Sequence, residues 1–152
     1  MSKLGTFLAV TGAFSFAAPA FAANVDVLML NKGAAGNAVF EPALVEIAVG
    51  DTVTFVLKDR WHNVGTIKGM LPVGATPFQS KINEQPFVVT FTVPGAYAIN
   101  CPPHYNMGMV GIIVVGHAPD NLDAIRAAAT QPPTPFTARG RFEAIFAELD
   151  AR

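Results

Sequence analysis

The residues with the clearest chemical potential lie together in one short loop. A thiol at Cys101, an imidazole at His104 and thioethers at Met107 and Met109 fall between two strand-like runs. Soft sulfur and imidazole donors suit copper, and two histidines, one cysteine and a weak axial methionine are the ligands of blue-copper electron-transfer sites. The loop itself supplies only one of the two histidines that such a site requires.

The second histidine must come from another part of the chain. The sequence offers His62 and His117 in addition to His104. His62 lies at the start of a strand-like stretch and is the better candidate, whereas His117 follows the last predicted strand and is expected to be a solvated linker residue. Two simpler alternatives stay open: His62 could be a satisfied histidine near a strand end, and His104 an ordinary surface residue.

Cys101 also needs an explanation, because it is the single cysteine of the chain. An intramolecular disulfide is impossible, and a lone thiol in an exported protein would be open to oxidation unless it is buried or bound. A buried structural thiol is the simpler alternative to a metal ligand.

The N-terminus has the features of a secretory signal peptide. Lys3 precedes a largely apolar stretch, and Ala20-Phe21-Ala22 forms a small-x-small cleavage site. Cleavage after Ala22 would leave one domain, residues 23–152, in the periplasm without a membrane anchor. An uncleaved anchor or a lipoprotein is the alternative, but no lipobox cysteine is present. The formal charge would move from −1 to −2, a balance that argues against non-specific nucleic-acid binding.

Most of the remaining chain consists of short runs rich in β-branched and aromatic residues, separated by turn signals. The predicted strands are 25–30, 44–49, 52–57, 87–93, 96–100 and 111–115. Strands at this spacing, without helices between them, favour an antiparallel sandwich or barrel.

After Gly116 the pattern becomes helical. Residues 119–129 and 137–152 are predicted helices, separated by a proline-rich linker that cannot be helical throughout. In the second helix one apolar stripe recurs at helical spacing; its members are Phe142, Ile145, Phe146 and Leu149. We expect a helical hairpin, about residues 119–151, packed on the sandwich as part of the same domain.

At this point the sequence resembles the cupredoxins, and among them the pseudoazurin family. The similarity rests on the Cys-x-x-His-x-x-x-x-Met loop, the upstream His-Asn-Val and the two C-terminal helices. It also includes several segments in order: 25–33, 40–55, 62–75, 80–84 and 94–97.

This resemblance implies a mainly β, eight-stranded Greek-key sandwich with two C-terminal α-helices and one type 1 copper near one end. The family pattern maps the ligands onto His62, Cys101, His104 and Met109, which leaves Met107 at the surface. It also implies that the Asn63 amide reaches the cysteine sulfur, while the Asn63 side chain ties its loop to the ligand loop.

The implied function is electron transport by a monomer that is not an enzyme. A copper nitrite reductase or nitrous oxide reductase would be a typical acceptor, with cytochrome c as an alternative partner. The acceptor is expected to dock over the edge of His104, on an apolar surface that includes Pro102, Pro103 and Met107. Candidate cations for the rim are Lys32, Lys58, Arg60, Lys68 and Lys81, of which the resemblance places Lys32 and Arg60 at the copper end.

Three departures from the family pattern concern the reduction potential and the surface that would contact the partner protein. Trp61 replaces a small residue before the first histidine; it could extend the docking surface, shield the site or pack partly buried. Pro102 adds a second proline to the loop, and the first strand lacks a histidine.

Two other functions compete with electron transport. A cysteine hydrolase would use Cys101 as nucleophile and His104 as base, but that function leaves Met109 and His62 unexplained. A copper storage or delivery protein would use exposed, exchangeable sulfur ligands. The mixed set found here favours the carrier.

Overall fold

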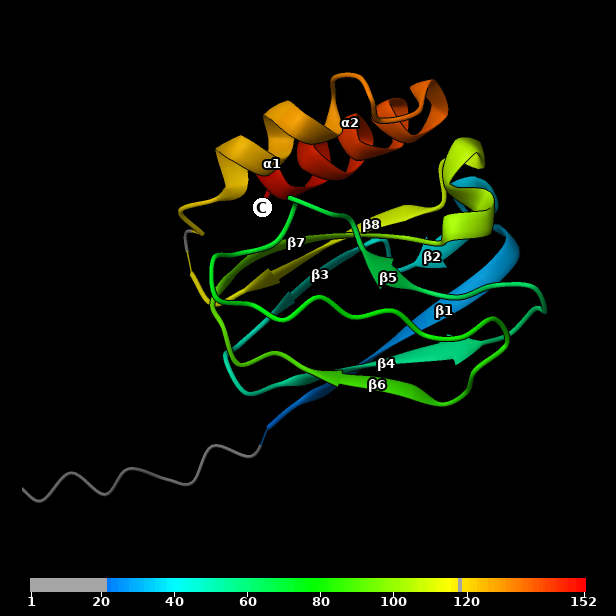
Figure 1. Cartoon of the computed structure of the whole chain (residues 1–152), viewed down its shortest axis with the longest axis horizontal. Coiled ribbons are helices and arrows are strands. Elements are labelled where there is room, and N and C mark those ends of the chain that lie inside the picture. Colours follow the sequence, from blue (N-terminus) through cyan, green and yellow to red (C-terminus); the bar gives the residue numbers. More distant parts are fainter. Residues whose placement is uncertain (1–21, 118) are drawn as a thin grey trace, which may run out of the picture.

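The computed structural model describes residues 22–117 and 119–152, which form two four-stranded β-sheets and a helical layer (Figure 1). The predicted signal peptide therefore lies outside the described residues, apart from Ala22. One sheet contains, in spatial order, β2 (Gly36–Glu41), β1 (Asn24–Gly33), β4 (Thr52–Leu57) and β6 (Phe87–Thr90). The other contains β3 (Leu44–Ile47), β8 (Val110–Val115), β7 (Gly95–Asn100) and β5 (Gly65–Thr66). The helices are the 3₁₀ helix η1 (Pro102–Met107), α1 (Leu122–Ala129) and α2 (Phe136–Asp150).

All six strands expected from the sequence are present, and the family expectation of eight strands is confirmed. The predicted strands 44–49 and 87–93 are longer than the observed ones, because strand pairing ends at Ile47 and Thr90. The residue pattern did not reveal β2 and β5. Strand β2 begins with Gly36 and Asn37, which are typical turn residues. Strand β5 has only two residues, which pair with the end of β7, and Gly65 also bridges to Gln79.

Of the expected antiparallel sandwich or barrel, the structure shows the sandwich, but two of its strand pairs are parallel. Strand β1 runs parallel to β4, and β3 runs parallel to β8. Both pairs join strands that are distant in the sequence. After the β1–β2 hairpin the chain crosses to the other sheet as β3 and returns as β4 beside β1, in the same direction as β1.

The main core lies between the two sheets and is rich in aromatic side chains. Phe55 and Phe40 meet edge to face with ring centroids 6.3 Å apart, and Phe91 meets Tyr97 in the same way at 5.0 Å. Such pairs add about 0.5–1.5 kcal/mol to what area burial alone provides. The Tyr97 hydroxyl donates a hydrogen bond of 2.7 Å to the Val93 carbonyl, which closes the turn before β7. Cys101 and Met109 belong to this core cluster.

A second core lies between the β7–β8 face and the two α-helices (Figure 1). Since β8 is covered on both faces, all six of its residues are buried. Phe142, Ile145 and Phe146 are buried in this layer, and Leu149 is partly buried beside them. The predicted helical hairpin on the sandwich is thus confirmed, although the first helix begins at Leu122 and not at residue 119.

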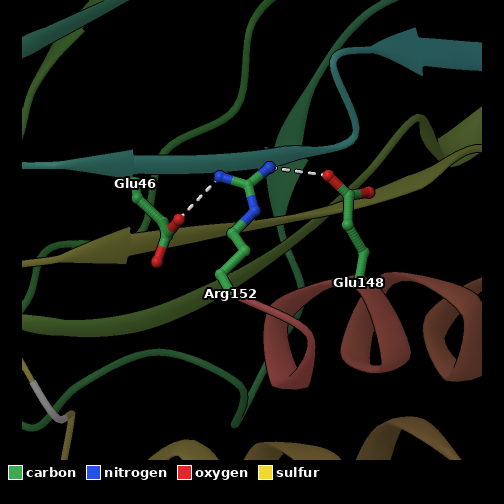
Figure 2. Close-up of polar contacts among 3 residues, drawn as sticks. All are labelled: Glu46, Glu148 and Arg152. Carbon is green, nitrogen blue, oxygen red and sulfur yellow. Dashed lines mark hydrogen bonds and ion pairs between the residues drawn. The ribbon is translucent and has the colours of Figure 1, made fainter.

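Exposed ion pairs tie the end of α2 to neighbouring elements. Arg152 donates to Glu46 on β3 at 2.7 Å and to Glu148 on α2 at 2.6 Å (Figure 2). Arg126 of α1 forms two hydrogen bonds with Asp150, at 3.0 and 2.7 Å. Among the described residues, no helix is both long and apolar enough to span a bilayer.

Candidate metal centre

The ligand loop is a hairpin connection between two adjacent strands. Cys101 follows the last residue of β7 and Met109 precedes the first residue of β8, with η1 between them. The Cys101 amide donates to the Met109 carbonyl at 3.0 Å, and the His104 amide donates to the Cys101 carbonyl at 2.9 Å. These bonds close the loop on itself, so its side chains keep fixed relative positions.

Gly108 allows α2 to pack directly on this loop. Its φ of +87° is a left-handed value that favours glycine. A Cβ atom there would lie 3.0 Å from Arg141 Cγ and 3.1 Å from Thr137 Cγ2. The helical layer therefore supports the ligand loop from outside.

Three of the predicted ligand residues meet at one end of the sandwich. The Cys101 sulfur lies 3.4 Å from His104 Nδ1 and 3.8 Å from His62 Nδ1. The three donor atoms all lie within 4.8 Å of one another. A metal with a thiolate at about 2.3 Å and an imidazole at about 2.0 Å, 120° apart, would place those two atoms about 3.7 Å apart. The donor set therefore fits a trigonal metal site.

Burial differs among the four predicted ligand residues. His62, Cys101 and Met109 have no accessible surface, whereas His104 is partly exposed. Met109 lies in the same core cluster as Cys101, while Met107 is 49% exposed. The surface position expected for Met107 is confirmed. The site opens to solvent through His104.

The environment of the thiol favours binding of a cation. Burial raises the pKa of Cys101, and hydrogen bonds from the backbone amides of Asn63 and His104 act in the opposite direction. Metal ligation requires the thiolate. A neutral thiol that is buried but already faces two amide donors and two imidazoles would be deprotonated by an incoming metal ion.

The environment of His62 also favours binding of a metal ion. Burial lowers the pKa of His62, as does the nearby His104, while Asp59 has a smaller opposing effect. The neutral imidazole that binds metals is therefore favoured. His62 Nε2 lies 2.9 Å from the Asn31 side-chain oxygen, so Nε2 carries the proton and Nδ1 faces the sulfur. Asn31 is itself held by a 2.6 Å bond from its amide to Asp59 Oδ2.

Asn63 has the contacts that the resemblance implied. Besides its amide contact with the thiol, its Oδ1 lies 3.6 Å from Cys101 Sγ. Its Nδ2 donates to the Ser80 carbonyl at 3.2 Å, and the Ser80 hydroxyl accepts a bond from the Val64 amide at 3.1 Å. The segment before β5 is thus held between the ligand loop and residues 78–83. Asn31 and Ser80 were missed by the sequence analysis, because a polar residue near a strand or turn carries no local signal of such a distant contact.

The structure also places the other histidine, two further methionines and the tryptophan. His117 is exposed beside Pro72 and Gly95, at the beginning of β7, whereas Cys101 follows the end of that strand. Met29 and Met70 are core residues. Trp61 is 66% exposed, which does not fit the partly buried packing residue that was one of its three alternatives.

Comparisons with known proteins agree with this geometry. Residues 27–116 match the family described as "Copper binding proteins, plastocyanin/azurin family". A pseudoazurin from Paracoccus pantotrophus is 47% identical over 142 residues, which cover 93% of this chain and 94% of the relative. A pseudoazurin from Methylorubrum extorquens is 42% identical, over 86% of this chain and 85% of the relative.

Solved structures show the same relationship. A pseudoazurin from Sinorhizobium has a TM-score of 0.77 at 44% identity and covers 84% of this chain and 97% of its own. A pseudoazurin structure from Methylobacterium extorquens gives 0.76 at 41% identity, over 83% and 98% of the two chains. The chain therefore belongs to the pseudoazurins, copper-binding electron-transfer proteins of the plastocyanin/azurin family that are carriers and not enzymes.

Proposed function

We propose that this chain is a periplasmic electron carrier that cycles one type 1 copper between Cu(II) and Cu(I) and passes electrons to a respiratory reductase, such as a copper nitrite reductase. The residues that would hold the copper are His62, Cys101, His104 and Met109. The observation that carries the proposal is the arrangement of the donors: two imidazoles converge on one thiolate donor in a buried site, and only His104 opens to solvent.

The bound copper would supply the one-electron chemistry, and the protein holds the ligands still. The Cys101–Met109 backbone bond, the Asn31 contact with His62 and the Asn63 contacts fix three parts of the site independently. Ligands held in this way change their positions little between the two oxidation states of the metal. Hydrogen bonds to the sulfur also tune the reduction potential.

The electron is proposed to leave through His104. This residue is partly exposed, and the surrounding loop presents Pro102, Pro103 and Met107 as exposed apolar groups. Weak redox encounters use small interfaces, and charges at the rim mainly raise the association rate. Lys32 and Arg60 are both exposed and could provide such steering.

Location in the periplasm follows from the proposed signal peptide. The Ala23 nitrogen donates to Asp51 Oδ1 at 2.7 Å, and β1 begins at the next residue. A mature chain that begins at Ala23 would keep the whole sandwich. Intact-mass measurement of protein from the periplasm tests this cleavage, and a main species that retains residues 1–22 would contradict it.

The carrier function is tested by the visible spectrum of the copper-loaded protein during reversible one-electron reduction. An intense thiolate-to-copper band should disappear on reduction and return on oxidation. A protein that instead releases its copper readily to an acceptor protein would be a storage or delivery protein.

Charge steering is tested with the double variant Lys32→Glu with Arg60→Glu. Its electron transfer to an acidic reductase should be slower at low ionic strength and should approach the wild-type rate at high salt. Oxidation by a neutral small-molecule oxidant is the control and should be equal in both proteins. Equal rates and equal salt dependence with the reductase would exclude steering by these two cations.

A further inference from the structure

We propose that Trp61 is a preorganised anchor for the protein partner, and that it adds an aromatic contact beside the His104 surface. The inference rests on the proposed carrier function and deepens it. Trp61 directly precedes a ligand candidate, yet its side chain is 66% exposed while His62 is fully buried. A large exposed aromatic group next to a buried redox site is available for contact with another protein.

The backbone around Trp61 is held in an unusual conformation. Its φ of +73° is rare for a bulky residue, and Asn83, which faces it, has a φ of +63°. The Trp61 amide donates to Asn83 Oδ1 at 2.6 Å, and the Asn83 amide donates to the His62 carbonyl at 2.9 Å. This pair of bonds, here called the Trp61–Asn83 clamp, fixes the direction of the chain at Trp61. Sparsely populated backbone conformations of this kind cluster at functional sites.

The anchor lies at the copper end of the sandwich. The loop after β4, which carries Trp61, and η1 lie at the same end of the molecule (Figure 1). The His62 and His104 rings, one from each of these segments, have centroids 4.7 Å apart. A partner seated over His104 would therefore find Trp61 beside it.

The surroundings of the clamp indicate the chemistry of the partner. Ile82, next to Asn83, is 50% exposed and adds an aliphatic group. Exposed cations flank this apolar pair in the sequence at Lys58, Arg60 and Lys81. The nearby carboxylates of Asp59 and Glu84 already accept 2.6 Å bonds from the amides of Asn31 and Lys81. The structure therefore fits a protein with an apolar docking centre and an acidic rim, as expected of an acceptor reductase.

Tryptophan is enriched among the few residues that dominate binding energy at interfaces. Because the clamp already restricts the Trp61 backbone, docking costs less conformational freedom there than it would on an unrestrained loop. The expected role is thus in the encounter with the partner and not in the chemistry at copper. Trp61 should affect the apparent KM for the partner and leave the copper spectrum unchanged.

The test compares Trp61→Gly, Trp61→Phe and wild type as electron donors to a purified copper nitrite reductase. Glycine accepts the positive φ, so Trp61→Gly removes the indole without adding backbone strain. We expect a rise of about tenfold in the apparent KM for Trp61→Gly, a smaller rise for Trp61→Phe, and an unchanged kcat. Asn83→Ala, which keeps the indole but removes the side-chain bond of the clamp, should give an intermediate KM.

Two controls separate an anchor from other roles. Val73→Ala alters a fully exposed apolar residue beside Gly95, at the far end of β7, and should leave KM unchanged. Oxidation by hexacyanoferrate needs no protein interface, so failure of wild type in that reaction would refute the carrier function itself. An unchanged KM in Trp61→Gly would overturn the anchor. So would a shifted visible band or potential in that variant, which would show that Trp61 instead shields the copper.

Discussion

The copper end of the sandwich and its helical face are stabilised in different ways. At the copper end, polar contacts between segments distant in the sequence hold two of the donors, Asn31 with His62 and Asn63 with Cys101. On the helical face, apolar burial dominates around Phe142 and Phe146, and the ion pairs there are exposed. The visible spectrum of the copper site and the free energy of unfolding should therefore depend on different residues.

The largest effect is expected from removing the thiolate donor. Cys101→Ser should abolish the intense visible band, because that band arises from charge transfer in the copper–thiolate bond. The sandwich should remain folded, since the change replaces one sulfur by one oxygen. Visible absorption with far-ultraviolet circular dichroism checks both statements, and a retained band would show that Cys101 is not a ligand.

A truncation in the helical layer should have the opposite signature. Phe146 is 2% exposed, stacks on Phe142 at 6.2 Å and lies under the Arg126 guanidinium. Phe146→Ala should reduce the free energy of unfolding by about 3–5 kcal/mol, while the copper band of the folded protein stays at its wild-type position. Denaturant unfolding measures the first quantity. A shifted band would mean that the helical layer controls the copper geometry.

The two methionines of the ligand loop provide a narrower comparison within the copper end. Met109→Leu should shift both the spectrum and the reduction potential, because it removes a weak axial donor. Met107→Leu changes an exposed residue and should do little. Spectra and voltammetry of the two variants decide the assignment, and the reverse ranking would move the axial role to Met107.

The smallest effect is expected at the C-terminal ion pairs. Arg152 bridges Glu46 and Glu148, but all three side chains are substantially exposed. Arg152→Ala should lower the free energy of unfolding by less than about 1 kcal/mol, with a smaller difference at high salt because exposed charges are screened. Denaturant unfolding at low and high ionic strength checks this expectation; a loss several times larger would show that the bridge holds α2 in place.

The sequence revealed the residues whose types are unusual and missed those whose roles depend on the fold. Sulfur and imidazole in one loop pointed to Cys101 and His104, and the need for a second imidazole pointed to His62. Asn31, Ser80 and Asn83 are common polar residues, and their importance comes from hydrogen bonds to segments distant in the sequence. Local patterns could not show these contacts.

The same limit applies to the strands. Hydrophobic patterning located six of the eight strands and missed β2 and β5. Strand β5 is only two residues long, and it is defined by its pairing with the end of β7. The parallel pairing of β1 with β4 and of β3 with β8 depends on how the chain crosses between sheets. Such crossings are a property of the complete topology, and the pattern of apolar and polar residues along one strand does not indicate them.

The exposure of Trp61 also has an optical consequence. It is the one tryptophan of the chain, so all indole fluorescence arises from a single position next to His62. An indole with 66% of its surface in water should emit at the long wavelengths typical of solvated tryptophan. Copper bound one residue away should quench this emission, and a docked protein should shift it to the blue. The molecule thus carries a built-in fluorophore that reports metal loading and partner binding without any label.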